Sequence, residues 1–278
     1  MKKLVSLLIL SISIFAFSAC GEKKDATSST PETEASNGKE MTFSEYFAKS
    51  KKEAQLWYRV RANDDGSSKD TEISSVYVFD NNKVTKYDEV EMSLGDVSKM
   101  DDSEIIKEIK KQQNEYDQNI IDDEIKRVEE TIHERENSTA GTDQIALFTQ
   151  QLNYLRDSKV YIPKPSKFNY SVQTDNSGNN TASEQISFSF KKQELAHLRI
   201  DESAEKDTVV KTQLVDDDEE ITFSGPSVLR GTTIYDAKYI TVNTDNDHFL
   251  LCRDNKMPPL VFDEPDTKNR NVKVDPKD

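Results

Sequence analysis

The two cysteines of this 278-residue chain lie in surroundings that predict different chemistry. Cys20 ends a stretch that begins with two lysines, continues with an unbroken apolar run at residues 4–17 and closes with two small residues. This order is typical of a secretory signal and places the thiol at a processing site. Cys252 lies in the apolar run of residues 248–253, which favours a small buried side chain in a strand over a reactive thiol. His248 would lie about 13 Å from it along a strand, too far to activate it.

The apolar run before Cys20 is expected to be the core of a signal peptide. Its 14 residues are fewer than the roughly 18 to 20 that a membrane-spanning helix needs. Cleavage after Ala19 by the ordinary signal peptidase would place Phe17 where that enzyme prefers a small residue. The sequence F-S-A-C at residues 17–20 instead resembles the lipobox of bacterial lipoproteins, whose commonest form begins with Leu. The resemblance implies that residues 1–19 are removed and that Cys20 carries a diacylglycerol; an uncleaved anchor or a free cysteine is the alternative.

Patterns that could hold a metal ion are incomplete. His133 and Glu134 begin like the zinc motif H-E-x-x-H, but Asn137 stands where the second histidine is needed, so we expect an exposed helix here. The acidic run D-D-D-E-E at residues 216–220 lacks the D-x-[DN]-x-[DN]-G order of a calcium loop. We expect a solvated hairpin loop at this run, with calcium binding as the alternative.

Patterns for nucleophilic catalysis are also incomplete. Ser227 is surrounded by part of a G-x-S-x-G motif, but Leu229 replaces the second glycine. Two S-x-x-K matches, at residues 36–39 and 189–192, are expected by chance in a chain rich in Ser and Lys. The sequence therefore predicts no catalytic residue, cofactor or metal ligand, and Cys20 as the one site residue, for lipid attachment.

The composition limits the classes of partner. Removal of residues 1–19 would leave 259 residues and, with Lys2 and Lys3 gone, lower the formal charge from -15 to -17. Such a chain is repelled by nucleic acid and by an anionic membrane surface. With 34% hydrophobic and 32% charged residues and a mean hydropathy of -0.78, we expect a modest core. Because only Cys252 would remain beside Cys20, no intramolecular disulfide is expected.

Folding is expected to begin after a tether. Residues 20–40 are polar and predict a disordered spacer of about 25 Å. In residues 41–100, Thr42 and Glu45 form a capping box that predicts a helix extending to about residue 54. Alternating side chains then predict a β-meander, with a half-buried strand at residues 56–62 and further strands at residues 73–79 and 84–87.

Residues 101–160 predict a helical hairpin. Isoleucines and valines recur at steps of 3, 4 and 7 up to about residue 136, although the stripe slips by one position between Ile120 and Ile121. One bent helix or two helices would both fit this slip. A second helix at residues 143–157 is predicted to pack against the first, and a partner-binding helix face is the alternative.

Residues 161–265 predict an antiparallel β-sheet, as a sandwich or partial barrel. Residues 193–200 fit either a short helix or a strand, and residues 266–278 form a polar tail that we expect to be frayed. The fold class is therefore α+β.

The segments at residues 94–111, 233–254 and 262–269 are similar to uncharacterised lipoproteins of Gram-positive bacteria. The resemblance implies placement on the outer face of the bacterial cell membrane, and the membrane, through the lipid anchor, as a partner. We expect a noncatalytic binding or interaction role with a protein or small-ligand partner that the sequence does not identify, and no nucleic acid. A cell-envelope hydrolase with a site formed only in three dimensions, and a calcium-dependent surface adhesin or sensor, are the alternatives.

Overall fold

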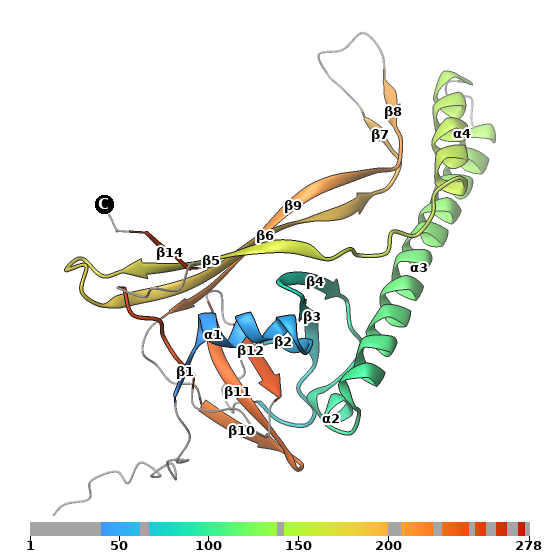
Figure 1. Cartoon of the computed structure of the whole chain (residues 1–278). Helices are drawn as coiled ribbons and strands as arrows, with labels where there is room; N and C mark the ends of the chain where they lie inside the picture. The colour runs from blue at the N-terminus through green and yellow to red at the C-terminus, as the bar shows by residue number, and fades with distance from the viewer. Residues whose placement is uncertain are drawn as a thin grey trace, which may run out of the picture. The chain divides into compact units, whose positions relative to one another are not determined.

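The fold is built on one curled antiparallel sheet (Figure 1). The computed structural model describes residues 40–61, 67–137, 142–199, 207–224, 230–244, 248–253, 260–265 and 272–275, all within the unit Asn37–Asp278. Cys20, the signal peptide and residues 20–39 of the tether lie outside the described residues. The main strands are β2 (Gln55–Arg61), β3 (Ile73–Asp80), β4 (Lys83–Asp88), β5 (Ser166–Thr174), β6 (Thr181–Glu194), β9 (Gln213–Ser224), β10 (Arg230–Ile234), β11 (Ala237–Thr244) and β12 (His248–Arg253).

The sheet joins strands from both ends of the chain. Its order is β10-β11-β12-β2-β3-β4-β5-β6-β9, so β12 pairs with β2 and β4 pairs with β5. A single pair, Thr244 with Phe223, brings β9 back to β11 and returns the sheet on itself. The α+β class and the barrel-like C-terminal sheet are thereby confirmed, and the N-terminal meander belongs to the same sheet.

Strand β2 is buried on both faces, although its alternation predicted a half-buried strand. Trp57 packs among the aromatic residues inside the curl, whereas Leu56, Tyr58 and Val60 pack in a second core on the other face. The second core also holds residues of β10, β11 and two helices, which cover what would otherwise be a solvated face. The prediction was wrong because alternation cannot reveal what covers the second face.

Helix α1 (Phe43–Ala48) supplies the first core with aromatic side chains from outside the sheet. The predicted capping box is confirmed, because Thr42 accepts a hydrogen bond from the Glu45 backbone and Glu45 accepts one from the Thr42 backbone. Phe43 stacks on Phe223 at 5.3 Å between ring centroids. The helix ends sooner than predicted and continues only as the short helix η1 (Lys49–Lys51).

Helix α3 (Asp102–Glu136) is one continuous helix, begun by the capping box of Asp101 and Glu104. Together with the short helix α2 (Leu94–Val97), its first turns cover the second core through Ile105 and Ile109. Helix α4 (Thr142–Arg156) packs against its C-terminal part, as Figure 1 shows, and the predicted hairpin is confirmed.

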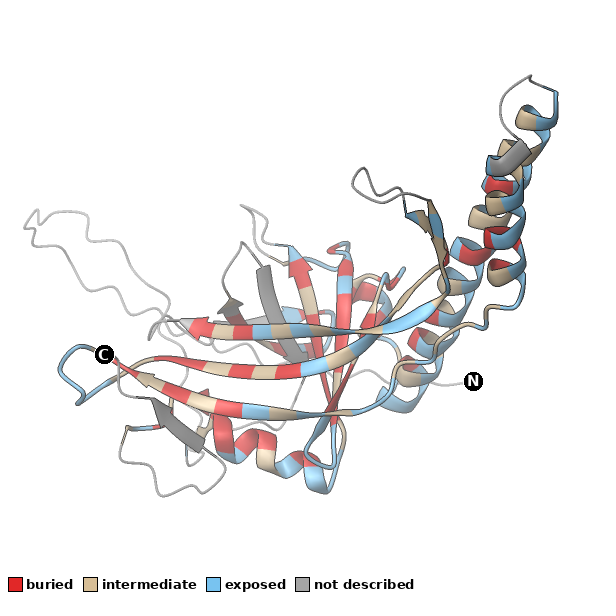
Figure 2. Ribbon diagram, turned by 90° about the horizontal axis from the view of Figure 1, so that it is seen from above, coloured by how far each residue is buried: buried red, intermediate tan, exposed pale blue. Residues whose placement is uncertain are grey.

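Strand β9 corrects the prediction for the acidic run. Residues 216–220 were expected to form a hairpin loop, but they lie inside β9 and pair with β6, from Asp216 beside Lys191 to Glu220 beside Ser187. Cross-strand partners explain why five acidic residues form a strand, since Asp216 pairs with Lys191 at 2.5 Å and Asp218 accepts a hydrogen bond from Ser189. Figure 2 shows the burial pattern along the sheet.

The remaining strands are short. β1 (Met41–Thr42) pairs in parallel with β13 (Leu260–Val261), and β7 (His197–Arg199) pairs with β8 (Thr208–Val210), which resolves the ambiguous segment as a strand. β14 (Val272–Asp275) pairs in parallel with β5. This part of the tail is therefore a strand and not frayed, because the outer edge of β5 offers it free backbone groups beyond the end of β4.

Candidate functional site

The middle of α3 contributes no side chain to the core beneath its first turns or to the cluster shared with α4. Ile105 and Ile109 pack on the sheet, and Val128 packs against α4. Between them, Tyr116 and Ile120 leave 37% and 41% of their surface exposed. The apolar stripe slips at residues 120 and 121 because the two halves of the helix bury different faces, the first half against the sheet and the second half against α4.

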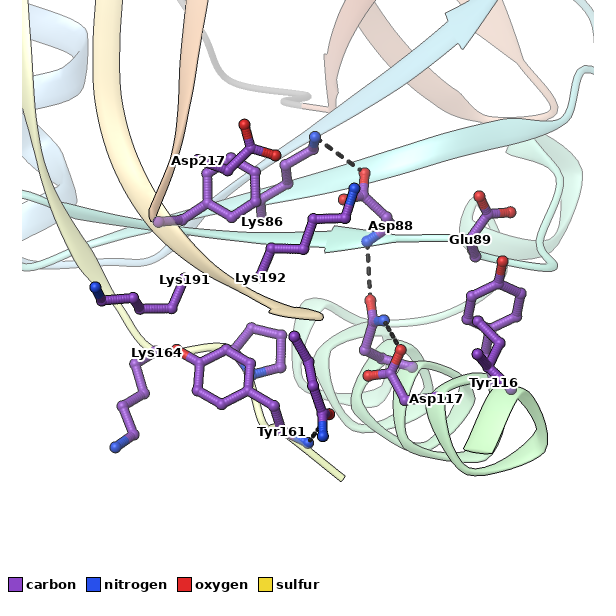
Figure 3. Close-up of a pocket in the computed structure, with 15 residues that line it drawn as sticks. Lys86, Asp88, Glu89, Tyr116, Asp117, Tyr161, Lys164, Lys191, Lys192 and Asp217 are labelled. Carbon is purple, nitrogen blue, oxygen red and sulfur yellow. Dashed lines mark hydrogen bonds and ion pairs between the residues drawn. The ribbon is translucent and has the colours of Figure 1, made fainter. Parts of the chain in front are cut away.

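A cavity of about 330 Å³ lies beside this part of the helix (Figure 3). This volume is within the range of small-molecule sites. Its walls come from α3, the end of β4, the outer part of β6, Asp217 of β9, and Tyr161, Pro163 and Lys164. The lining residues include Lys86, Asp88, Glu89, Gln113, Tyr116, Asp117, Ile120, Tyr161, Phe190, Lys192 and Asp217.

Hydrogen bonds join β4 to α3 at one side of the cavity. The Asp88 backbone N–H donates to Oε1 of Gln113 at 2.9 Å, and Nε2 of Gln113 donates to Oδ1 of Asp117 at 3.1 Å. The Asp88 carboxylate is engaged by Ser75 at 2.8 Å and by Lys86 at 3.2 Å. Because Gln113 is buried and uses both amide atoms, it holds Asp117 in place.

Glu219 anchors the next layer of the site from β9. Its carboxylate accepts from Tyr77 at 2.5 Å and lies 3.1 Å from Arg59 and 2.7 Å from Lys86. Burial and the Glu219 charge raise the pKa of Tyr77, which keeps the phenol protonated as a donor. Burial would lower the pKa of Lys86, but Asp88 and Glu219 outweigh it, so this lysine remains a cation.

Other charges at the cavity have no ion-pair partner in the described part of the chain. They are Lys164 and Lys192 among the cations and Glu89, Asp117 and Asp217 among the anions. Desolvation and the neighbouring Asp88 raise the pKa of Asp117, because only a neutral amide stabilises its charge. In Figure 3, Lys192 reaches toward the Asp88 end of the cavity, whereas Lys164 extends away from it.

Glu89 is held in an unusual backbone conformation. Its φ of 53° lies in the left-handed region, which is rare for a residue that is not glycine. The Glu89 carboxylate lies beside the Tyr116 hydroxyl in Figure 3, and burial together with the Glu89 charge raises the pKa of Tyr116. Strain of this kind persists where surrounding structure imposes it, and it often marks functional sites.

Aromatic and aliphatic side chains complete the cavity. The Phe190 ring lies 5.1 Å from the Lys86 ammonium nitrogen, and Tyr161 is held by its backbone N–H, which donates to Gln193 at 3.0 Å. The lining residues include no Ser, Cys or His. The arrangement can therefore bind a ligand through charge and apolar contact, but these residues offer no Ser–His or Cys–His nucleophile.

A second cluster is electrostatically unusual but closed to ligands. Glu184 and Asp263 are 0% and 1% exposed. Glu184 accepts from the Tyr170 hydroxyl and the Asp263 backbone, and Asp263 accepts from the backbone and hydroxyl of Ser44 at 3.0 and 2.5 Å. Burial raises the pKa of Glu184 to about 8, with the Asp263 charge adding to it. The cluster fastens residues 260–265 to α1 and β6, which is a structural role.

Only some of the residues that the sequence motifs single out lie within the described residues. Cys20, Ser227 and residues 36–39 lie outside the described residues, as does the Cys252 side chain, although its backbone is in β12 as predicted. His133 is exposed in the last turn of α3, as expected for a surface residue. Within the S-x-x-K match at residues 189–192, Ser189 bonds to Asp218 while Lys192 lines the cavity.

Sequence reasoning missed the cavity residues. Lys192, Asp117 and Tyr161 come from segments far apart in the chain, and only Lys192 falls in a motif match, the S-x-x-K at residues 189–192. The one available signal was the slip after Ile120, where the first apolar stripe ends, because Tyr116 and Ile120 at that end of the stripe are exposed.

No group of three or more His, Cys, Asp or Glu side chains in the described ranges is placed to hold a metal ion. The helices of the described residues include none with the length and apolar character needed to span a membrane. Comparison of the chain with family models, curated proteins and solved structures finds no match.

Proposed function

We propose that the chain is a lipid-anchored extracytoplasmic binding protein with a noncatalytic role, and that the cavity beside α3 is its ligand site. The signal and F-S-A-C at residues 17–20 support the anchor. The observation that carries the ligand site is the combination, in one cavity of about 330 Å³, of aromatic side chains with charges that no described residue neutralises. Among these charges the Asp117 carboxylate is half-buried, whereas Glu89, Lys164 and Lys192 are exposed. A partly desolvated charge without an opposite charge is costly, so a ligand that compensates Asp117 is favoured.

A screen of small molecules tests the ligand site. Ligand-observed NMR on the purified full chain in detergent, with compounds that are cationic, anionic, zwitterionic and neutral, should identify a binder. Ile120→Arg, at the cavity wall, should abolish its binding by adding bulk and charge where the ligand lies.

Ile162→Arg is the matched control, because Ile162 is 63% exposed and does not line the cavity. It should leave binding unchanged. If no compound of any charge class binds, or if Ile120→Arg and Ile162→Arg behave alike, the cavity is not the ligand site.

A further inference from the structure

The unneutralised charges of the cavity are arranged with opposite signs on different elements. Glu89 and Asp117 belong to the β4–α3 side and Asp217 to β9, whereas Lys192 reaches from β6 toward the Asp88 end (Figure 3). From this arrangement we propose that the cavity binds a small zwitterion, a free amino acid or short peptide with an ammonium group, a carboxylate and an apolar side chain. The inference rests on the proposed function and names the ligand class for that site.

The ammonium end is placed by Asp117 and Tyr116. The Asp117 carboxylate is half-buried, and the hydrogen bond that it accepts comes from the neutral Gln113 amide. A cation beside it would supply the opposite charge that the described residues lack. The partly exposed Tyr116 ring offers a face for the same cation, and Glu89 adds a second carboxylate next to it.

The carboxylate end is placed by Lys192. Two other lysines of the cavity are already neutralised, Lys86 by Glu219 and Asp88 and Lys191 by Asp216. Lys164 extends away from the cavity in Figure 3. Lys192 is therefore the inward ammonium that is left for a ligand carboxylate.

The remaining space suits an apolar side chain. Phe190, Tyr161 and Ile120 line it, and the volume of about 330 Å³ accommodates an amino acid or a dipeptide. A purely anionic ligand would leave Asp117 and Glu89 facing its negative charge, and a purely cationic ligand would leave Lys192 unmatched. A ligand that carries both charges avoids both penalties.

The test uses L-phenylalanine and alanyl-phenylalanine, each beside its N-acetylated and its C-amidated form. Binding to the full chain in detergent is measured by isothermal titration calorimetry or ligand-observed NMR. At least one zwitterion should bind. Blocking either of its charges should lower the binding affinity by about tenfold or more, as expected for a lost charge-assisted contact.

Two variants assign the charges to residues. Asp117→Asn should weaken binding of the zwitterion and make it bind no better than its N-acetylated form, while the zwitterion still binds better than its C-amidated form. Lys192→Gln should also weaken binding of the zwitterion, but should remove its advantage over the C-amidated form and preserve its advantage over the N-acetylated form. Glu115→Gln and Lys167→Gln, which are exposed and do not line the cavity, make the same charge changes and should leave both preferences intact.

The inference is overturned if no zwitterion binds, if blocked and free forms bind equally, or if Asp117→Asn and Lys192→Gln leave the preferences unchanged. If a compound of another charge class binds, and Ile120→Arg abolishes its binding, the assignment of a zwitterionic ligand is wrong although the cavity is still the ligand site. Failure of every class to bind would remove the ligand site itself.

Discussion

Glu184 shows how one residue can couple the stability of this protein to pH. It is fully buried against Tyr170 and the backbone of Asp263, and its pKa is raised to about 8 from the ordinary value of 4.5. A carboxyl group with a raised pKa binds its proton more tightly in the folded than in the unfolded protein. Its stabilising effect is therefore full below about pH 4.5 and is lost as pH rises through about 8.

The prediction is that Glu184→Gln removes this dependence. The amide resembles the protonated carboxyl, because its oxygen can accept from the Asp263 backbone and its nitrogen can donate to Tyr170. Relative to the unmodified protein, the variant should gain stability as pH rises from 5 to 9, by up to about 5 kcal/mol at the upper end. Urea unfolding across that pH range measures the difference.

Glu115→Gln, at an exposed position of α3, is the control and should change the pH profile little. A Glu184→Gln curve that runs parallel to that of the unmodified protein would show that Glu184 is ionised in the folded state at neutral pH.

At the scale of elements, β9 explains the most acidic run in the chain. Its residues 213–222 pair with β6 on one side, and no strand of the described residues pairs with the other side. An unpaired strand edge is a template for association with other chains, and charged side chains are a common protection against it. The exposed members of the run are Asp216, Asp218 and Glu220.

The triple variant Asp216→Asn, Asp218→Asn, Glu220→Gln should therefore self-associate. The substitutions keep side-chain size but remove the repulsion between edges of two molecules. Sedimentation velocity or light scattering should detect dimers or larger species at concentrations where the unmodified protein is monodisperse.

An equal change in net charge on a helix separates the edge effect from a general loss of charge. Asp122→Asn, Asp123→Asn, Glu130→Gln alters three exposed carboxylates of α3 and should leave association unchanged. If both triple variants associate to the same extent, net charge and not the strand edge controls it.

At the scale of the whole molecule, the proposed lipid anchor would decide where the ligand site operates. Cys20→Ala removes the thiol that the lipobox resemblance identifies for modification. The variant should be released from the membrane or accumulate as an uncleaved precursor, because a single short apolar run without lipid does not hold a chain stably. Cell fractionation with immunoblotting measures both outcomes. Normal processing with full membrane retention would show that Cys20 is not the anchor.

Local patterns in the sequence determined the elements whose causes are local. The capping boxes at Thr42 and Asp101 start helices because their partners lie three residues away. The hairpin turn between β3 and β4 follows from Asn81 and Asn82, which adopt positive φ. The α+β class follows from the same periodicities, because each reports on one segment at a time.

Tertiary structure alone decided which segments meet. The acidic run at residues 216–220 became a strand because β6 offers it cross-strand partners, and β2 is buried on both faces because other elements cover it. The cavity unites Asp117, Tyr161 and Lys192 through pairings that no local pattern specifies. Such contacts depend on the free energy of the whole packed chain, whereas a capping box or an alternating strand depends on neighbours within a few residues.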